Sequence, residues 1–222
     1  MAVLCQIRSS VLGHLVRQTI PVLIALLLLS ISAQAQPPCP AGATTVTVVR
    51  QMSYNNVCCD VKITYCYLLS GNTFQVQLID AVVEDASCWG LTPGSAPPFS
   101  ANYFVNYLRD LVLRSAYPGT LTTCPTMTTV NIVFLNGTCA QLKQRVYDPD
   151  GPGGPLPEEL QLYLEWCSNI ACVRECQVCV DTTNLDPCTS EPRLYFECST
   201  NYNQDCPNYL PQPNNCEALC GS

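Results

Sequence analysis

The protein is a chain of 222 residues in which 17 Asp and Glu outnumber 10 Lys and Arg, giving a formal net charge of −7. An acidic surface does not recruit nucleic acid or anionic lipid, because binding to those polymers depends on Lys and Arg that release counterions. The composition therefore predicts no nucleic-acid partner.

Residues 1–35 have the pattern of a signal peptide. Two arginines form a basic n-region, and the apolar run from Ile20 to Ile31 is too short to cross about 30 Å of hydrocarbon. Ala33-Gln34-Ala35 supplies a cleavage site of the small-x-small type, which predicts a secreted, extracellular or periplasmic protein. The alternative is an uncleaved membrane anchor; after cleavage we expect no stable anchor.

Cleavage also changes the chemistry available to the mature chain of 222 − 35 = 187 residues. The bases fall from 10 to 8 and the net charge becomes 8 − 17 = −9. The single histidine, His14, is lost, which excludes Ser-His-Asp and Cys-His nucleophile systems, the usual catalytic zinc sites and histidine pH switches.

Cysteine is the most informative residue type. Of 17 cysteines, Cys5 leaves with the signal peptide, and the even number that remains predicts up to eight disulfides in an oxidising compartment. The cysteines expected to form them are Cys39, Cys58, Cys59, Cys66, Cys88, Cys124, Cys139, Cys167, Cys172, Cys176, Cys179, Cys188, Cys198, Cys206, Cys216 and Cys220. Seven precede the Pro/Gly-rich stretch 148–157 and nine follow it, so complete internal pairing requires at least one disulfide between the two sides.

The first predicted elements of the mature chain are β-strands. Residues 44–50 are β-branched and predict a short strand. Residues 57–85 alternate between polar and apolar side chains around a turn at Ser70-Gly71-Asn72, which predicts a long hairpin.

Three cysteines of this hairpin constrain one another. Cys58 and Cys59 should point to opposite faces of the strand and therefore bond different partners. Cys58 and Cys66 share a face but lie about 26 Å apart at ~3.3 Å per residue, which is beyond the reach of a disulfide.

A helix and a second hairpin should follow. Ser100 is a candidate N-cap, residues 101–117 carry an apolar stripe, and Pro118-Gly119 ends the helix. Residues 126–147 predict a hairpin that turns at Asn136-Gly137, a preferred two-residue pair. Asn136-Gly137-Thr138 also matches a glycosylation sequon, but a tight turn is the preferred interpretation.

The stretch 148–157, DPDGPGGPLP, is the clearest change in composition. It divides a β-hairpin and helix region, 36–147, from a cysteine-rich C-terminal region, 158–222, that disulfides should link to it. A helix is expected from Pro157 through Cys167, because Glu158 and Glu159 would lie in its positive first turn. If this helix continues, Cys172, Cys176 and Cys179 lie on one stripe of it. Beyond Cys179 we expect loops, with a strand only at 193–197.

The cluster WCSNIACVRECQVC, residues 166–179, admits three interpretations. A redox couple at Cys176 and Cys179 would need a stabilised thiolate, but the pair falls late in the expected helix and beside Glu175. A zinc site formed by the four cysteines would usually have a second CxxC pair. Structural disulfides require neither condition, so we favour them and expect no metal and no cofactor.

Carboxylates offer a weaker signal. Acid pairs occur at Glu84/Asp85, Asp148/Asp150 and Glu158/Glu159, and a hydrolase would need two acids facing each other across a cleft. Asp148-Pro149-Asp150-Gly151 matches part of a calcium loop but lacks its third acid and distal Glu. No acid is assigned a catalytic role.

The best candidates for binding are tyrosines and asparagines near the C-terminus, because these side chains supply contact area and hydrogen bonds at low entropic cost. They are Tyr195, Asn201, Tyr202, Asn203 and Tyr209. The alternative is that the tyrosines pack against nearby disulfides.

Together these features predict an α+β fold: antiparallel β-hairpins, one or two helices and a disulfide-stapled, loop-rich C-terminal region. The expected function is a non-enzymatic binding or surface-structural module, with an extracellular protein or glycan as partner. The alternatives are a secreted hydrolase that uses carboxylates and, third, a thiol-disulfide oxidoreductase at Cys176/Cys179.

Overall fold

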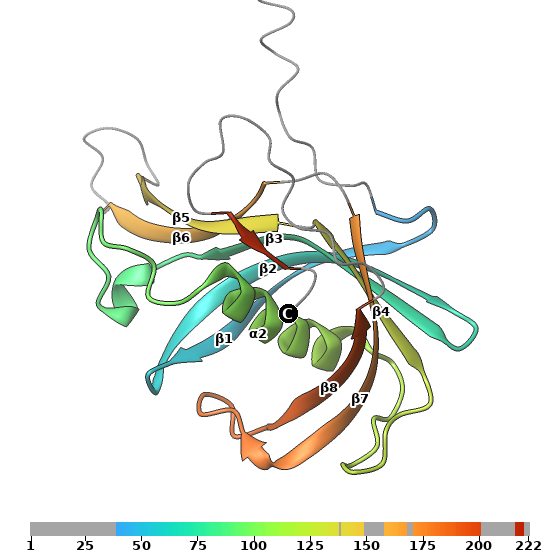
Figure 1. Cartoon of the computed structure of the whole chain (residues 1–222). Coiled ribbons are helices and arrows are strands. Elements are labelled where there is room, and N and C mark those ends of the chain that lie inside the picture. Colours follow the sequence, from blue (N-terminus) through green and yellow to red (C-terminus); the bar gives the residue numbers. More distant parts are fainter. Residues whose placement is uncertain (1–38, 138, 149–157, 168–170, 201–215, 220–222) are drawn as a thin grey trace, which may run out of the picture. The chain divides into compact units, whose positions relative to one another are not determined.

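The structure, a computed structural model, describes residues 39–137, 139–148, 158–167, 171–200 and 216–219. Within them, nine strands form one sheet and a single α-helix lies against it (Figure 1). The strands are β1 (Thr44–Tyr54), β2 (Val57–Ser70), β3 (Thr73–Val83), β4 (Asn131–Gly137), β5 (Cys139–Tyr147), β6 (Glu159–Trp166), β7 (Ala171–Leu185), β8 (Pro192–Thr200) and β9 (Glu217–Ala218). The helices are a short 3₁₀ turn, η1 (Ala86–Trp89), and α2 (Ala101–Ala116). The fold is therefore richer in sheet, and poorer in helix, than the expected α+β arrangement.

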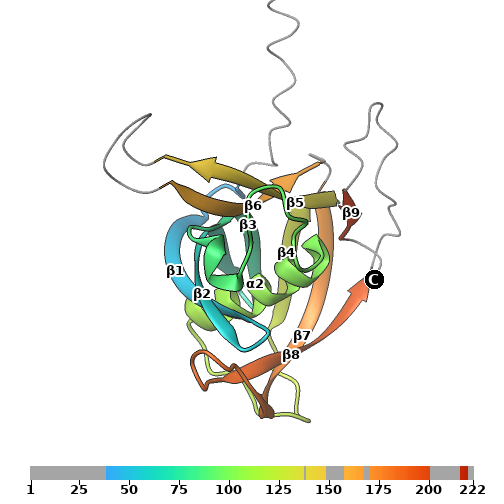
Figure 2. The same cartoon turned by 90° about the vertical axis from the view of Figure 1, so that its left-hand side faces the viewer.

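Strand β3 pairs with three other strands, β2, β4 and β6. The strands of the sheet run in the order β8-β7-β4-β3-β6-β5-β9, and β2 and β1 add to the other side of β3. The first half of β3 pairs in parallel with β4, and Val82 and Val83 at its end pair with β6. Figures 1 and 2 show the sheet curling around α2, with β1 and β2 on one side of the helix and β7 and β8 on the other.

The predicted first hairpin is confirmed. β2 and β3 pair antiparallel from Ser70↔Thr73, with Gly71 in the left-handed region of the turn. Along β2 the apolar side chains that point to the core, such as Ile63, are buried, and the intervening Lys62 is exposed. The expected strand 44–50 is also present and extends to Tyr54 as β1.

The predicted helix is confirmed as α2. The Ser100 side chain accepts a hydrogen bond from the Tyr103 N–H at 3.0 Å, which satisfies one of the free donors of the first turn. Phe104 and Leu108 are fully buried against the sheet, each contributing about 1.5–3 kcal/mol through removal from water. The helix ends at Ala116, and its C-cap Tyr117 precedes Pro118.

The prediction of a second hairpin at 126–147 is wrong. β4 pairs with β3 and β7, whereas β5 pairs with β6 and β9. Ile132 and Phe134 of β4 are buried in the core, and this position between two other strands satisfies both edges of β4. Burial at distant strands overrides the local turn preference of Asn136-Gly137.

The prediction of a helix that begins at Pro157 is also wrong. Glu159–Trp166 is strand β6, and its buried leucines, Leu160, Leu162 and Leu164, recur every second residue. That is the period of a strand with one face on the core. The acids and proline that suggested a helix start carried less weight than this alternation.

The region after Cys179 is more regular than the loops that we expected. β7 continues to Leu185, and β8 returns antiparallel to it, so the strand expected at 193–197 is confirmed within a longer one. β6 and β7 belong to the same sheet as β3 and β4, so strands from 36–147 and 158–222 are interleaved.

Six disulfides connect the described residues: Cys39–Cys66, Cys58–Cys188, Cys59–Cys88, Cys124–Cys179, Cys167–Cys216 and Cys176–Cys198. Cys139 is also disulfide-bonded. Cys58 and Cys59 bond different partners, as their opposite directions on the strand predicted. Cys58–Cys188 and Cys124–Cys179 join the two sides of the stretch 148–157, as the parity of the cysteines required.

Several expectations concern residues outside the described ranges. They include the signal peptide 1–35, most of the Pro/Gly-rich stretch, and the sequon residue Thr138. Within the described ranges, no helix is long and apolar enough to cross a membrane.

Candidate binding site

A pocket of about 470 Å³ lies between α2 and strand β8. Strands β4 and β7 also supply lining residues, so four elements contribute to the pocket. The lining residues are Asn106, Arg109, Phe134, Arg174, Leu194, Tyr195, Phe196, Glu197 and Cys198. We refer to this cavity as the α2–β8 pocket.

A buried carboxylate of the helix holds α2 beside β8. Asp110 accepts a hydrogen bond from the Leu194 N–H at 2.8 Å through Oδ1, and one from Arg114 at 2.7 Å through Oδ2. Burial raises the pKa of Asp110, while Arg114 and the Leu194 N–H act in the opposite direction. The helix thus satisfies a backbone donor of β8 and fixes one wall of the pocket relative to the other.

Two arginines give the pocket its charge. Arg109 is only 7% exposed; its guanidinium lies 5.2 Å from the centre of the Phe134 ring and donates to Asn106 Oδ1 at 2.8 Å. Burial, and secondly the charge of Arg174, lower the pKa of Arg109 to about 9. Burial also lowers the pKa of Arg174. The two guanidinium groups line one cavity, and the charge of Arg174 disfavours the charged form of Arg109.

Aromatic side chains form the rest of the pocket. Phe134 and Phe196 meet edge to face with their ring centres 5.8 Å apart. Tyr195 stands at the rim with 53% of its surface exposed, among the most exposed large side chains of the described chain. The pocket therefore combines positive charge, apolar surface and one accessible phenol.

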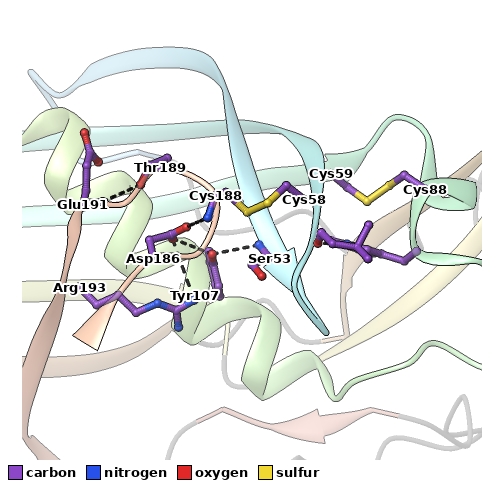
Figure 3. Close-up of a disulfide and its surroundings, with 12 residues drawn as sticks. Ser53, Cys58, Cys59, Cys88, Tyr107, Asp186, Cys188, Thr189, Glu191 and Arg193 are labelled. Atoms are coloured by element: carbon purple, nitrogen blue, oxygen red, sulfur yellow. Dashed lines mark hydrogen bonds and ion pairs between the residues drawn. A yellow bond between two sulfur atoms is a disulfide. The ribbon is translucent and has the colours of Figure 1, made fainter. Parts of the chain in front are cut away.

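The β7–β8 turn beside the pocket is fixed by a buried polar network centred on Asp186, which has no exposed surface (Figure 3). Tyr107 donates from its hydroxyl to Asp186 Oδ2 at 2.7 Å and accepts from the Ser53 N–H at 3.0 Å. The Cys188 N–H donates to Asp186 Oδ1 at 2.9 Å. One hydroxyl of α2 thereby contacts both β1 and the β7–β8 turn.

Two cations complete the network. Arg114 and Arg193 lie 3.5 and 4.0 Å from Asp186 Oδ2, and Arg193 also stacks on the Tyr107 ring at 4.5 Å. Burial opposes charge on Asp186, but the hydrogen bonds from Tyr107 and Cys188 and the two arginines lower its pKa below the ordinary value. Burial raises the pKa of Tyr107. A carboxylate that stays charged and sealed from solvent supports the fold and has no access to a substrate.

Disulfides reinforce the same region. Cys176–Cys198 links β7 to β8 at directly paired positions, and Cys198 lines the pocket. Cys58–Cys188 ties the β7–β8 turn to β2 at the edge of the Asp186 network (Figure 3). The walls of the α2–β8 pocket are therefore held by covalent links as well as by buried hydrogen bonds.

Of the binding residues expected from the sequence, Tyr195 lies at this pocket. Asn201, Tyr202, Asn203 and Tyr209 lie outside the described residues. Sequence reasoning missed Asn106, Arg109 and Arg174. The signal available for Arg109 was a charged residue next to the apolar stripe of the helix, but only the tertiary structure places it beside Arg174.

Three residues of the predicted acid pairs, Glu84, Asp85 and Glu159, line a different cavity of about 430 Å³. Asp60 lines the same cavity. Glu84 pairs with Lys62 at 3.4 Å, and both side chains are about half exposed. Asp85 accepts hydrogen bonds from the Ser87 N–H and hydroxyl, which cap the η1 turn. Two of these carboxylates therefore have local structural partners. Asp150 lies outside the described residues.

The structure does not support a redox couple at Cys176 and Cys179. Cys176 and Cys179 bond Cys198 and Cys124 and not each other, because an odd separation on a strand turns them to opposite faces. The helical stripe expected for these cysteines does not exist. Among the residues that the structure describes, no group of three or more His, Cys, Asp and Glu side chains is placed to hold a metal ion.

No protein-family model, curated protein or solved structure matches the chain.

Proposed function

We propose that this protein is an exported, disulfide-rich, non-enzymatic binding module whose ligand site is the α2–β8 pocket. The observation that carries the proposal is the pocket itself: a cavity with cationic and aromatic walls and Tyr195 exposed at its rim. Its six described disulfides fit an extracellular environment, where such bonds form and persist.

Rigidity favours binding at this site. A ligand site loses affinity when loops and side chains must be ordered on association. Here β7 and β8 are cross-linked by Cys176–Cys198, and the turn between them is held by Cys58–Cys188 and the Asp186 network. Little ordering therefore remains to oppose a ligand that enters the pocket.

The groups that line the pocket suit recognition. Arg109, Arg174 and Asn106 can orient a polar group, and the phenylalanines and Tyr195 can cover an apolar one. This mixture of apolar surface with a few placed polar groups is typical of ligand sites. An extracellular protein or glycan is the class of partner that we expect to present such a group.

A second candidate is a hydrolase that uses the acidic cavity lined by Glu84, Asp85 and Glu159. The observation in its favour is that residues from two of the acid pairs meet there. Against it, a general acid of a hydrolase needs a sheltered carboxyl group, whereas the Glu84 side chain is 45% exposed. Asp85 is already engaged in capping η1.

The test is to map ligand contacts on the purified exported protein. We would screen neutral fragments and oligosaccharides by ¹H–¹⁵N chemical-shift perturbation and titrate each hit against Tyr195→Ala. Loss of a rim aromatic that contacts ligand should weaken binding by more than about 1 kcal/mol, roughly fivefold or more. Tyr147→Ala is the matched control, because Tyr147 is 43% exposed but lies on β5.

Perturbations that gather on α2, β7 and β8, with affinity lost in Tyr195→Ala alone, would support the proposal. Perturbations centred on Glu84 and Glu159, or equal losses in the two tyrosine variants, would contradict it. The first of these contrary results would favour the hydrolase, and turnover of the bound oligosaccharide would then be measured.

A further inference from the structure

The α2–β8 pocket carries a specific prediction about ligand chemistry. We propose that it binds an organic acid group carried by the protein's extracellular partner, with the carboxylate or sulfate against Arg109 and Arg174 and an adjoining apolar part against Phe134 and Phe196. This inference rests on the proposed function and deepens it, because it assigns the class of ligand.

The placement of the two guanidinium groups is the first argument. Arg109 comes from α2 and Arg174 from β7, and both line one cavity. Each is partly or wholly removed from water, and their mutual repulsion contributes to the lowered pKa of Arg109. An oxyanion between them would relieve that repulsion, and in a site of low dielectric the attraction is much stronger than at an exposed surface.

The geometry of guanidinium is the second argument. Its planar fork of N–H donors matches the two oxygens of a carboxylate or sulfate, so that each pairing can be bidentate. Arg109 is already oriented by the Phe134 ring on one side and by Asn106 Oδ1 on another. A guanidinium held in this way loses less rotational freedom when it receives an anion than a mobile surface side chain does.

The apolar surface determines the second part of the ligand. Phe134 and Phe196 pack edge to face in the same cavity, so a ligand that reaches the arginines also contacts aromatic rings. At about 470 Å³ the pocket falls within the usual range of ~300–1,000 Å³ for small-molecule sites. A bare inorganic ion would leave most of this volume and all of the aromatic surface unused.

The net charge of the protein limits how an acidic ligand can be attracted to the pocket. The mature chain carries a net charge of 8 − 17 = −9, so the protein as a whole repels anions. Glu197 also lies on the pocket lining, where its carboxylate opposes the entry of an anion. Preferential binding of an acid must therefore come from direct contact with the two arginines, and this preference should be lost when one of them loses its charge.

The experiment compares three probes of similar shape on the purified exported protein by titration calorimetry. The probes are naphthalene-2-carboxylate, naphthalene-2-sulfonate and the neutral naphthalene-2-carboxamide. We expect one or both acids to bind at least about tenfold more tightly than the amide, the preference that charge-assisted hydrogen bonds give over neutral ones. The ratio between the two acids distinguishes a carboxylate site from a sulfate site.

Arg174→Gln is the decisive variant. Glutamine keeps a hydrogen-bonding side chain but removes the charge, and Arg174 is less buried than Arg109, so the fold tolerates the change better. The acid-over-amide preference should fall to less than about threefold in this variant. Arg145→Gln is the control, because Arg145 lies on β5 outside the pocket, with its guanidinium 5.1 Å from the centre of the Tyr163 ring.

The outcomes separate this inference from the proposed function. If the amide binds as tightly as both acids and perturbs the pocket, the acid inference is overturned and the binding module stands. If Arg174→Gln keeps the full preference, or if no probe binds up to its solubility limit, the acid inference is overturned as well. The screen with neutral fragments and oligosaccharides then decides the proposed function independently.

Discussion

Replacing Asp186 by asparagine tests whether the buried network sets the stability of the β7–β8 turn. Asn keeps the shape of the side chain and one oxygen for the Cys188 N–H. Its amide, however, presents donors to the Tyr107 hydroxyl at 2.7 Å and to Arg114 at 3.5 Å, groups that themselves donate. The substitution therefore removes the acceptor around which the network is built.

The size of the effect follows from these contacts. Loss of a hydrogen bond to a charged group costs about 1.5–3 kcal/mol, and removal of one partner from a buried ion pair costs about 3–5 kcal/mol. Arg114 and Arg193 are partly exposed, at 14% and 25%, which reduces their share. We expect Asp186→Asn to lower the free energy of unfolding by about 3 kcal/mol, equivalent to roughly 6–12 °C in Tm for a chain of this size.

The assay is chemical and thermal unfolding with the disulfides intact, alongside Glu191→Gln as the control. Glu191 pairs with Arg114 at 2.8 Å in the same network, but its side chain is 64% exposed, so its loss should cost less than about 1 kcal/mol. Equal and small losses in the two variants would refute the reasoning. The turn would then be held by the Cys58–Cys188 disulfide alone.

Two further predictions follow from the same features. Asp186 has a pKa below its ordinary value of 3.8, so its contribution to stability is present above that pH and is lost as the pH falls through the lower, folded-state pKa. The stability difference between wild type and Asp186→Asn, measured by denaturation from pH 7 to about pH 2, should therefore shrink only below pH 3.8. Asp110, whose pKa burial raises, acts in the opposite sense and shares Arg114 with Asp186. Separately, peptide mapping without reduction should recover Cys176 linked to Cys198 and Cys179 linked to Cys124; a peptide in which Cys176 and Cys179 bond each other would contradict the structure.

The disulfide pattern gives the vicinal pair Cys58-Cys59 a clear structural role. Because the two side chains leave opposite faces of β2, one strand is tied to two separate places, the β7–β8 turn through Cys188 and the η1 turn through Cys88 (Figure 3). Each link can stabilise the fold by about 2–4 kcal/mol by restricting the unfolded chain. Strand β2 therefore connects the β7–β8 turn that supports the α2–β8 pocket to the η1 turn.

Local pattern was sufficient wherever one stretch of chain contains the whole reason for its conformation. The β2–β3 hairpin needs only its alternation and the turn at Gly71, and α2 needs only its apolar stripe and the Ser100 cap. The side chains of Cys58 and Cys59 point to opposite faces because successive residues of a strand alternate between its two faces. The parity of the cysteines required a link across residues 148–157 because it depends only on counting.

Local pattern failed where two signals competed. In β6 the two-residue period of Leu160, Leu162 and Leu164 was present in the sequence, but Pro157 and the acids after it suggested a helix start. In β4 the Asn136-Gly137 pair suggested a hairpin, although the strand in fact joins β3 and β7. Burial between distant strands decided both cases, and a window of neighbouring residues does not contain those strands.

By itself, the sequence predicted that this chain depends on disulfides and that its strand cysteines bond distant partners. The tertiary structure alone decided which cysteines pair, and it alone brought Arg109, Arg174 and Tyr195 to one pocket. The physical reason is that charge, exposure and cavity shape belong to surfaces assembled from α2, β4, β7 and β8. Those elements meet only because burial of the sheet around the helix brings them together.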